Sequence, residues 1–385
     1  MLDADIIRPD ALAADDRRAW QALRRSTPAF ASPLLSPEFA EAVAEVRGDA
    51  MVAVLRFDGR PVGFLPHHRR PGAFGRPLGA PFSDVQALIA EPWVDAAEAL
   101  SVTGLARFSF TGLIDPHRAF DTEDLAERAV ASSYAIHLDG TAEAYLEARR
   151  AASPKRFKNI RRLDHKLDRE VGPVRLIAGD TDRGHFGQLI AWKREQFRRT
   201  GLHDVLGSTW TQALMDSLFD RKDGDFRSLM LTLMVGDKVA AVHFGVREGA
   251  RYHPWLAAVD PALSAWSPGQ VFFWRAIEAM PDLALTHYDL SSGHDHYKLP
   301  FASDVSEVVS GVWSRGAGLK AQGWSLAERA VGPVRAASLG RVRRRLDNIA
   351  TTELSLGGRV QGLAYALASQ GRRNTDMARH TETGA

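Results

Sequence analysis

The sequence contains no cysteine. This absence excludes disulfide bonds, thiolate catalysis and cysteine-ligated zinc or iron–sulfur sites, and it is consistent with a reducing compartment. No uninterrupted apolar run reaches the roughly 18 residues that a membrane-spanning helix needs. The stretch from Met1 to Asp16 is acidic and lacks the basic and then apolar order of a secretory signal. We therefore expect a cytoplasmic protein.

Net charge is also small, +2 over 385 residues, but it is unevenly distributed. The tail after Arg315 has many arginines and few acidic residues. A hydrophobic content of 45% is ample for a packed core. We predict two domains and an extra segment, with boundaries at 1–145, 146–315 and 316–385.

Two hairpin patterns indicate that the first two domains are related. Ala50 to Phe57 is followed by the turn Asp58-Gly59 and by a second run, Pro61 to Pro66. Leu229 to Val235, Gly236-Asp237 and the run from Val239 repeat this order. The first copy lacks the later motifs of the second, so we interpret it as a degenerate, substrate-shaping domain. Chance similarity of two short hairpins remains the alternative.

The second hairpin leads into a strand, a turn, a helix and another strand. Tyr252 to Val259 is rich in strand-forming residues, Gln270 to Met280 reads as a helix, and Leu285 to Leu290 reads as a strand. We expect Ser267 to cap the helix and Pro268 to occupy its first turn. Such a helix start offers free N–H groups and a positive dipole end to an anion, for example a pyrophosphate. A well-capped helix with no ligand is the alternative.

This order of elements resembles the core of the GNAT acyltransferases. More narrowly, it is similar to the branch tied to cellulose and exopolysaccharide biosynthesis, which is related to the FemAB aminoacyl transferases, and to the N-acetyltransferases of holdfast polysaccharides. The residues that carry the resemblance are Tyr252-His253-x-Trp255, Ser267-Pro268-Gly269, Asp289-Leu290 with Gly293, and Tyr297-Lys298.

The resemblance implies an α/β (α+β) fold of tandem GNAT-like domains, with mixed, mainly antiparallel sheets flanked by helices and a basic helical C-terminal segment. It also implies acetyl-CoA as co-substrate, transferring its acetyl group to an amino sugar of an exopolysaccharide or of its lipid-linked precursor. Two alternatives stay open. One is a FemAB-like transferase that uses aminoacyl-tRNA on a peptidoglycan-type precursor, and the other is a non-catalytic GNAT-fold binding or regulatory module.

Acetyl transfer needs a held thioester, a deprotonated amine, a polarised carbonyl and a proton donor for the thiolate. Asp289 follows a strand and could take the amine proton, or it could simply cap the following turn. His243 and His253 lie on neighbouring antiparallel strands, so we expect their side chains to approach each other. Either could be the base if its pKa is near neutral, or each could be a packed histidine.

Tyr297 could donate a proton to the thiolate, and Lys298 could stabilise the oxyanion or hold an anionic substrate. A core tyrosine and a solvated lysine are the alternatives. The coenzyme A site implied by the resemblance consists of Ser267, Pro268, Gly269 and Gln270, although this turn lacks the glycine pattern of ordinary GNAT enzymes. His294-Asp295-His296 has no third ligand motif, so we expect no metal.

A basic helical stretch, Thr141 to Arg169, precedes the second domain and restarts at Ser153-Pro154. It could form a cationic wall for a phosphorylated or lipid-diphosphate-linked substrate, or for nucleic acid, or it could be a solvated helix face. The residues assigned to substrate binding are Lys155, Arg156, Lys158, Arg161 and Arg162, and the resemblance adds Trp255.

The C-terminal segment has helix-like stretches from Leu319 to Ala330 and from Val334 to Leu346. Its basic cluster consists of Arg341, Arg344 and Arg345. This cluster could dock on the anionic inner face of a membrane, contact a partner or bind a cyclic dinucleotide. The alternative is a solvated basic helix without a ligand. The spacing to Leu354-Ser355-Leu356-Gly357-Gly358 is too short for a PilZ signature, so no PilZ barrel is predicted.

Overall fold

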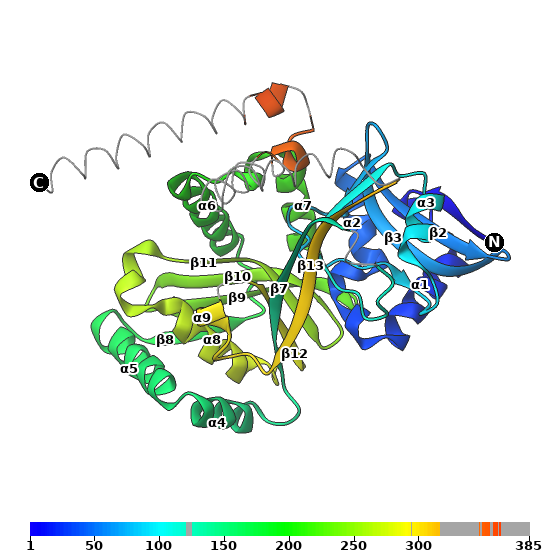
Figure 1. Cartoon of the computed structure of the whole chain (residues 1–385). Helices are drawn as coiled ribbons and strands as arrows, with labels where there is room; N and C mark the ends of the chain where they lie inside the picture. The colour runs from blue at the N-terminus through cyan, green and yellow to red at the C-terminus, as the bar shows by residue number, and fades with distance from the viewer. Residues whose placement is uncertain are drawn as a thin grey trace, which may run out of the picture.

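A computed structural model describes residues 1–120, 125–293, 295–315, 346, 349–354, 357–360 and 362. Its core is one 13-stranded mixed sheet with helices packed on both faces (Figure 1). The strands are β1 (Leu2–Ile7), β2 (Ala50–Phe57), β3 (Arg60–Arg70), β4 (Phe74–Pro77), β5 (Ile89–Ala90), β6 (Arg107–Leu113), β7 (Ala126–His137), β8 (Val174–Ala178), β9 (Phe226–Val235), β10 (Lys238–Glu248), β11 (Arg251–Val259), β12 (His287–Ser292) and β13 (Asp304–Ser314).

The helices are α1 (Ala14–Ser26), α2 (Pro37–Val46), α3 (Ala96–Val102), α4 (Ala142–Ala152), α5 (Pro154–Glu170), α6 (Arg183–Thr200), α7 (Thr209–Asp220), α8 (Pro268–Ala279) and α9 (Asp295–Lys298). Short 3₁₀ turns are η1 (Pro9–Ala11), η2 (Pro28–Ala31), η3 (Pro33–Leu35), η4 (Val205–Gly207) and η5 (Pro261–Trp266). Both predicted hairpins are present, as is the predicted break of the basic helix between Ala152 and Pro154.

The strand order repeats itself from the two edges of the sheet toward its centre. The order is β1-β2-β3-β4-β6-β13-β7-β12-β11-β10-β9-β8, and β5 pairs with β3 off this path. From each edge, an antiparallel meander leads to one parallel pair, β4 with β6 on one side and β11 with β12 on the other. The predicted mixed, mainly antiparallel sheet of two related halves is therefore confirmed.

The two halves exchange strands at the centre of the sheet. β7 follows β6 in the chain but pairs with β12, whereas β13 follows the second half and pairs with β6. β7 and β13 also pair with each other over most of their length. The sheet therefore runs without interruption through both halves, and the domain boundaries at 145 and 315 stay a prediction.

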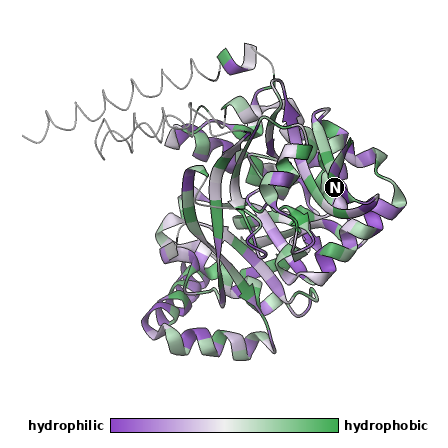
Figure 2. Cartoon of the chain, turned by 45° about the vertical axis from the view of Figure 1, so that its right-hand side comes forward, coloured by the Kyte–Doolittle hydropathy of each residue, from purple (hydrophilic) through white to green (hydrophobic). Residues whose placement is uncertain are grey.

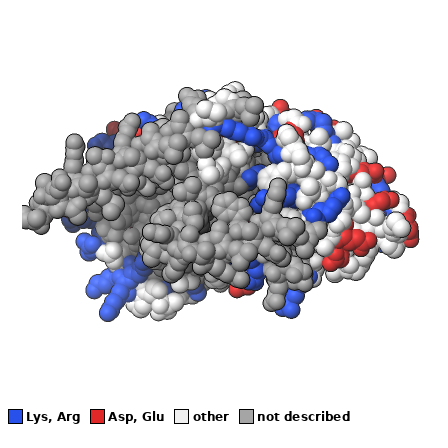
Figure 3. Space-filling model, turned by 45° about the horizontal axis from the view of Figure 1, so that its top comes forward, with Lys and Arg blue, Asp and Glu red and all other residues white. Residues whose placement is uncertain are grey.

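Three apolar clusters hold the helices on the sheet. The first joins α1, α2, α6 and α7 to β2 and β10, and it contains Trp20, Phe39 and Phe244. The second joins α4, α5 and α8 to β9 and β12, and the third lies beneath α3. Figure 2 shows hydrophobic residues along the strands and hydrophilic residues on the outer faces of the peripheral helices. Acidic side chains gather at the end of the molecule formed by the N-terminal half (Figure 3).

The parallel pair β11–β12 is very short, and this shapes the functional region. Its register contains two pairs, Arg251 with His287 and Tyr252 with Tyr288. A β-bulge interrupts β10–β11 at Phe244/Gly245, and another interrupts β12–β7 between Asp289 and Ser291. Bulges turn strands away from their ladders. β11 and β12 thus separate beyond Tyr252 and leave a wedge between them.

The C-terminal helices predicted from Leu319 and from Val334 fall on residues that the structure does not describe. The described part of this segment packs on α7 and on the loop before it. The Trp210 indole donates a hydrogen bond to the Thr352 carbonyl at 2.9 Å, and His203 Nε2 lies 3.2 Å from Glu353 Oε1. Among the residues with described placement, no helix has the length and apolar character needed to cross a membrane.

Candidate active site

A cavity of about 550 Å³ occupies the wedge between β11 and β12. Its walls come from α6, from the two strands, from α8 and α9, and from a loop of the first half. Four of the five predicted catalytic residues line it, together with Trp255 and the positively charged Lys193 and Arg199. The four are His243, Asp289, Tyr297 and Lys298.

The fifth predicted catalytic residue, His253, lies behind the cavity wall between two carboxylates. Its Nε2 is 2.8 Å from Asp84 Oδ1, and its Nδ1 is 3.0 Å from Asp289 Oδ2. The His253 side chain is 1% exposed, whereas Asp289 is 26% exposed and reaches the cavity. Asp84 comes from the loop after β4, so this ion triad joins the first half of the chain to the second.

The two carboxylates determine the charge of His253. Burial acts to lower its pKa, but the attraction of Asp84 and Asp289 outweighs burial and raises the pKa to about 10. Desolvation likewise opposes ionisation of Asp84, and the His253 charge nevertheless holds the pKa of that carboxyl below its ordinary value. His253 is therefore a fixed imidazolium at neutral pH and is not available as a base.

His243 has the opposite electrostatic environment. Its ring stacks on Phe272 of α8 at 4.0 Å, and its Nδ1 lies 2.7 Å from the Tyr288 hydroxyl. Burial, assisted by the charges of Lys193 and Lys298, lowers the pKa of His243 to about 3. The expectation of a near-neutral imidazole is therefore wrong for both histidines.

The expected approach of the two histidines is wrong as well. His243 pairs with Ala257, and His253 pairs with Val246, three residues further along β10. Side chains separated by an odd number of strand positions point to opposite faces. His243 accordingly packs on α8, whereas His253 points to the other face of the sheet, where Asp84 lies.

Asp289 serves the turn and the triad with different oxygens. Oδ1 accepts a hydrogen bond from the Ser291 N–H at 2.6 Å, and Oδ2 faces His253. Ser291 has a φ of 59°, a left-handed conformation that the short side-chain-capped turn supports. The capping alternative for Asp289 is therefore present in the structure, alongside its exposure to the cavity.

The four residues predicted to hold coenzyme A, at the start of α8, are not among the residues that line the cavity. The helix start also differs in one respect from the expectation. Ser267 adopts φ 49° and ψ 55°, and its side chain makes no capping hydrogen bond. Pro268 occupies the first helical position as predicted, and the Gln270 N–H is donated to the Ser267 carbonyl at 3.0 Å. Ser267 is thus not a side-chain cap, because its left-handed backbone turns the chain from η5 into α8.

Tyr297 packs directly against this helix start. An added Cβ on Gly269 would lie 2.3 Å from the Tyr297 hydroxyl oxygen, so only glycine leaves room for the phenol. Burial raises the pKa of Tyr297, with the charge of Arg156 acting in the opposite sense. The phenol is therefore protonated at neutral pH and can donate. Lys298 Nζ donates a hydrogen bond to the Ser292 carbonyl at 2.7 Å while lining the cavity.

Replacing Gly269 with alanine is expected to displace Tyr297 or the first turn of α8. Overpacking of this kind costs about 1–3 kcal/mol, so the midpoint of thermal unfolding should fall. Gly187 in α6 is the matched control, because an added Cβ there meets nothing within 4 Å. Gly187→Ala should stabilise the protein by roughly 0.5–1 kcal/mol. Equal midpoints for the two variants would contradict the close contact of Gly269 with Tyr297.

The predicted basic wall separates into two parts. Lys158, Arg161 and Arg162 line a shallow groove on the outer face of α5, away from the wedge cavity. Lys155 is exposed on the same helix. Arg156 is half-buried, and its charge acts on Tyr297. Of the five basic residues assigned to substrate binding, Arg156 is therefore the one whose charge acts on a predicted catalytic residue.

A second cavity of about 720 Å³ adjoins the triad. Asp289 lines both cavities, and His253 lines the second. The second cavity is bounded by β7, β13 and the η2–η3 segment, and its charged lining is mainly acidic. The acidic residues are Asp115, Asp289, Asp304 and Glu307, and the positively charged ones are Arg251 and His253. His287 also lines this cavity, but burial lowers its pKa to about 4 and leaves it neutral.

Sequence reasoning missed Asp84, Lys193 and Arg199. Asp84 is distant from His253 in the chain, and its position depends on a loop pressed against Gly112, where an added Cβ would lie 2.0 Å from the Asp84 carbonyl oxygen. Lys193 and Arg199 belong to an amphipathic helix whose charged face looks solvated in sequence. The predicted regulatory residues Arg341, Arg344 and Arg345 lie outside the described residues.

Residues 154–299 match the model of the acetyltransferase (GNAT) domain family. No curated protein matches the chain. Similar solved structures include FemX, with 10% identity and a TM-score of 0.47 over 76% of this chain and 95% of that chain. A tandem GNAT protein from the clavulanic acid biosynthesis pathway has 12% identity and a TM-score of 0.47, over 83% of this chain and 99% of that one. The C-terminal domain (DUF2156) of a protein described as a lysylphosphatidylglycerol synthetase from Agrobacterium fabrum has 10% identity and a TM-score of 0.46, over 81% and 95%.

The matched range includes α5, the β9–β11 meander, the start of α8, β12 and α9. It therefore contains the wedge and all five predicted catalytic residues, and it leaves Asp84 to the preceding half. Over residues 154–299, the chain is similar to the acetyltransferase (GNAT) domain family.

Proposed function

We propose that the protein transfers an acetyl group from acetyl-CoA to the amine of an amino sugar in an exopolysaccharide or its lipid-linked precursor. The observation that carries the proposal is that Asp289 lines both cavities at the point where β11 and β12 separate. A thioester in the first cavity and an amine in the second would meet there. The acyl-transfer chemistry rests on the GNAT match, and the amino-sugar acceptor is the finer part of the proposal.

The first cavity suits the donor. Beyond Tyr252, the edge of β11 that faces the wedge does not continue its pairing with β12, so its backbone groups are open to the amides of a pantetheine arm. Lys193, Arg199 and Lys298 supply positive charge for the phosphates. The positive end of α8 adds to this field, although Pro268 has no N–H to donate.

The second cavity suits an amine. The carboxylates of Asp115, Asp289 and Glu307 attract an ammonium ion and raise its local concentration. Asp289 is the carboxylate that reaches both cavities, so it is placed to take a proton from the amine as the amine attacks the thioester carbonyl. The imidazolium of His253 holds Asp289 in position.

The reaction forms one bond and breaks another, and the residues of the two cavities can handle both proton transfers. The amine nitrogen forms the C–N bond, the C–S bond breaks, and the thiolate of coenzyme A leaves. The Tyr297 phenol, protonated and close to the start of α8, is placed to give the thiolate a proton. Lys298 and Arg156 add positive charge beside the developing anions.

The first experiment is calorimetric titration with acetyl-CoA, with coenzyme A and a charged tRNA as comparisons. We expect saturable binding of acetyl-CoA, weakened about tenfold by the double change Lys193→Gln and Arg199→Gln, because two solvent-accessible ion pairs of up to about 1 kcal/mol each together amount to about 1.4 kcal/mol. Lys238→Gln, at the exposed first residue of β10, is the matched control. Release of the coenzyme A thiol with a panel of amino sugars then identifies the acceptor.

Absence of acetyl-CoA binding would overturn the proposal. Binding of the charged tRNA alone would favour the aminoacyl-transfer alternative, for which the exposed cationic groove on α5 is the supporting observation. Binding of none of the three would favour a non-catalytic module.

A further inference from the structure

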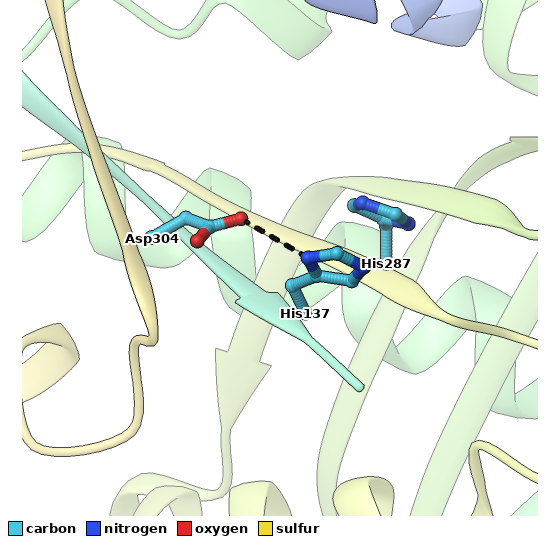
Figure 4. Close-up of side chains that lie close together, drawn as sticks. All are labelled: His137, His287 and Asp304. Atoms are coloured by element: carbon cyan, nitrogen blue, oxygen red, sulfur yellow. Dashed lines mark ion pairs between the residues drawn. The ribbon is translucent and has the colours of Figure 1, made fainter. Parts of the chain in front are cut away.

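Three side chains with metal-binding chemistry converge beside the second cavity. His137 is the last residue of β7, His287 is the first residue of β12, and Asp304 is the first residue of β13. One ligand atom from each lies within 4.8 Å of the other two. Figure 4 shows the His137 ring between the Asp304 carboxylate and the His287 ring. His287 and Asp304 line the second cavity.

Strand pairing creates this convergence. His137 and His287 are directly opposed in the antiparallel pair β7–β12, and their rings stack with centroids 4.0 Å apart. Asp304 pairs with Ala135, two positions before His137 on the same strand, so it reaches the same face from the other side. The sheet itself therefore holds two imidazoles and one carboxylate close together. An imidazole binds a metal in the plane of its ring, so one of the two stacked rings must rotate about its side-chain bonds for both to reach one ion.

The hydrogen-bond partners of the two histidines leave one ring nitrogen of each for a metal ion. His137 Nδ1 lies 3.7 Å from Asp304 Oδ2, close to the roughly 3.3 Å between two ligands of a tetrahedral zinc ion. His137 Nε2 lies 3.0 Å from Asp139 Oδ1, and a metal-bound imidazole commonly has its second nitrogen on a carboxylate in this way. The Thr286 hydroxyl contacts His287 Nδ1 at 2.9 Å, which leaves the Nε2 of His287 for an ion.

We propose that His137, His287 and Asp304 bind a divalent transition-metal ion, with Zn²⁺ as the preferred class, on the wall of the second cavity. Two imidazoles and one carboxylate are a ligand set that such ions favour over calcium or magnesium. The site is open to solvent, because the Asp304 side chain is 55% exposed, so this carboxylate is free to rotate and close the coordination shell. The fourth position would face the cavity and accept an anionic oxygen of a ligand.

Arg251 offers a test of whether positive charge near the site weakens metal binding. It pairs with His287 in the parallel ladder, and its charge interacts with Asp304. A guanidinium beside a cation opposes its binding. Arg251→Gln should therefore tighten the metal site, whereas changes of the ligands should weaken it.

The test uses the full chain, freed of any histidine tag and treated with a chelator. Zn²⁺ is titrated in competition with a chromophoric chelator, and Co²⁺ is used separately for its absorption spectrum. We expect one ion per chain, with affinity reduced at least about a hundredfold in His287→Ala and in His137→Ala, and about tenfold in Asp139→Asn. His165→Ala, on the exposed face of α5, is the control and should leave binding unchanged.

Thermal unfolding in the presence of chelator shows whether each variant folds. Absence of stoichiometric binding in the folded wild-type protein would overturn the proposal. Zn²⁺ binding that is unaffected in folded His287→Ala and His137→Ala would overturn it too, because the ion would then bind elsewhere. Neither result depends on acetyl-CoA or on turnover, so failure of the metal site leaves the proposed acyl transfer untouched.

Discussion

Replacing Asp289 with asparagine is expected to lower the turnover number for amide formation by about 10²–10⁴-fold, the usual contribution of a positioned general base. The amide retains an oxygen that can accept the Ser291 N–H, so the turn after β12 should persist. It cannot take a proton from the amine. Thiol release at saturating acetyl-CoA, together with the affinity for acetyl-CoA, separates these two functions.

The matched control is Asp216→Asn, on the exposed face of α7, where the carboxylate pairs with Arg183 at the surface. It should leave turnover and stability within error of the wild type. If Asp289→Asn folds, binds acetyl-CoA and turns over at the control's rate, Asp289 acts as a turn cap and an ion partner alone. The proton must then be taken by another group or by solvent.

The sequence predicted local structure well because local structure depends on nearby residues. The hairpins at Asp58-Gly59 and Gly236-Asp237, the helix restart at Pro154 and the helix from Pro268 all follow from turn chemistry and periodicity. The exceptions within these elements are informative. Ser267 has a residue type that favours capping, but the left-handed turn from η5 into α8 determines its conformation.

Charge states could not be predicted in the same way. From the sequence, His253 is a candidate base. In the fold, Asp84 of the other half lies with its Oδ1 2.8 Å from His253 Nε2, which keeps the imidazole charged. His243 became a neutral, stacked histidine because α8 covers it. Both outcomes depend on long-range packing, and neither a single strand nor its spacing contains that information.

The same limit applies to the second cavity. His137, His287 and Asp304 have no motif spacing, since β7 and β13 meet only because the two halves exchange strands at the centre of the sheet. The His294-Asp295-His296 stretch, which looked more like a metal motif, includes residues whose placement is not described. Sheet register, in contrast to sequence proximity, brings the candidate ligands together.

Replacing His253 with glutamine is expected to be the most destabilising single change near the site. The side chain is 1% exposed and lies between two carboxylates, so its loss leaves Asp84 and Asp289 without their shared counter-charge. Removing one member of a buried ion pair typically costs about 3–5 kcal/mol. Chemical denaturation at neutral pH measures this difference in the free energy of unfolding.

The pH dependence distinguishes loss of this charge from a simple packing defect. In the unfolded chain a histidine titrates near pH 6.5, whereas the pKa of His253 in the folded protein is about 10. The folded state therefore holds a proton that the unfolded state releases, and the stabilisation is complete below about pH 6.5 and is lost as the pH rises through about 10. The wild type should lose on the order of 3–5 kcal/mol more than His253→Gln between pH 6.5 and pH 10.

His185→Gln is the control, because His185 also pairs with a carboxylate, Asp180, but at the start of α6 and remote from the triad. It should not remove the alkaline loss of stability seen in the wild type. Parallel stability curves for the wild type and His253→Gln across this pH range would mean that His253 is neutral in the folded protein. The carboxylates would then be held by hydrogen bonds rather than by charge, and Asp289 would have to be reconsidered as a fixed anion at the meeting point of the two cavities.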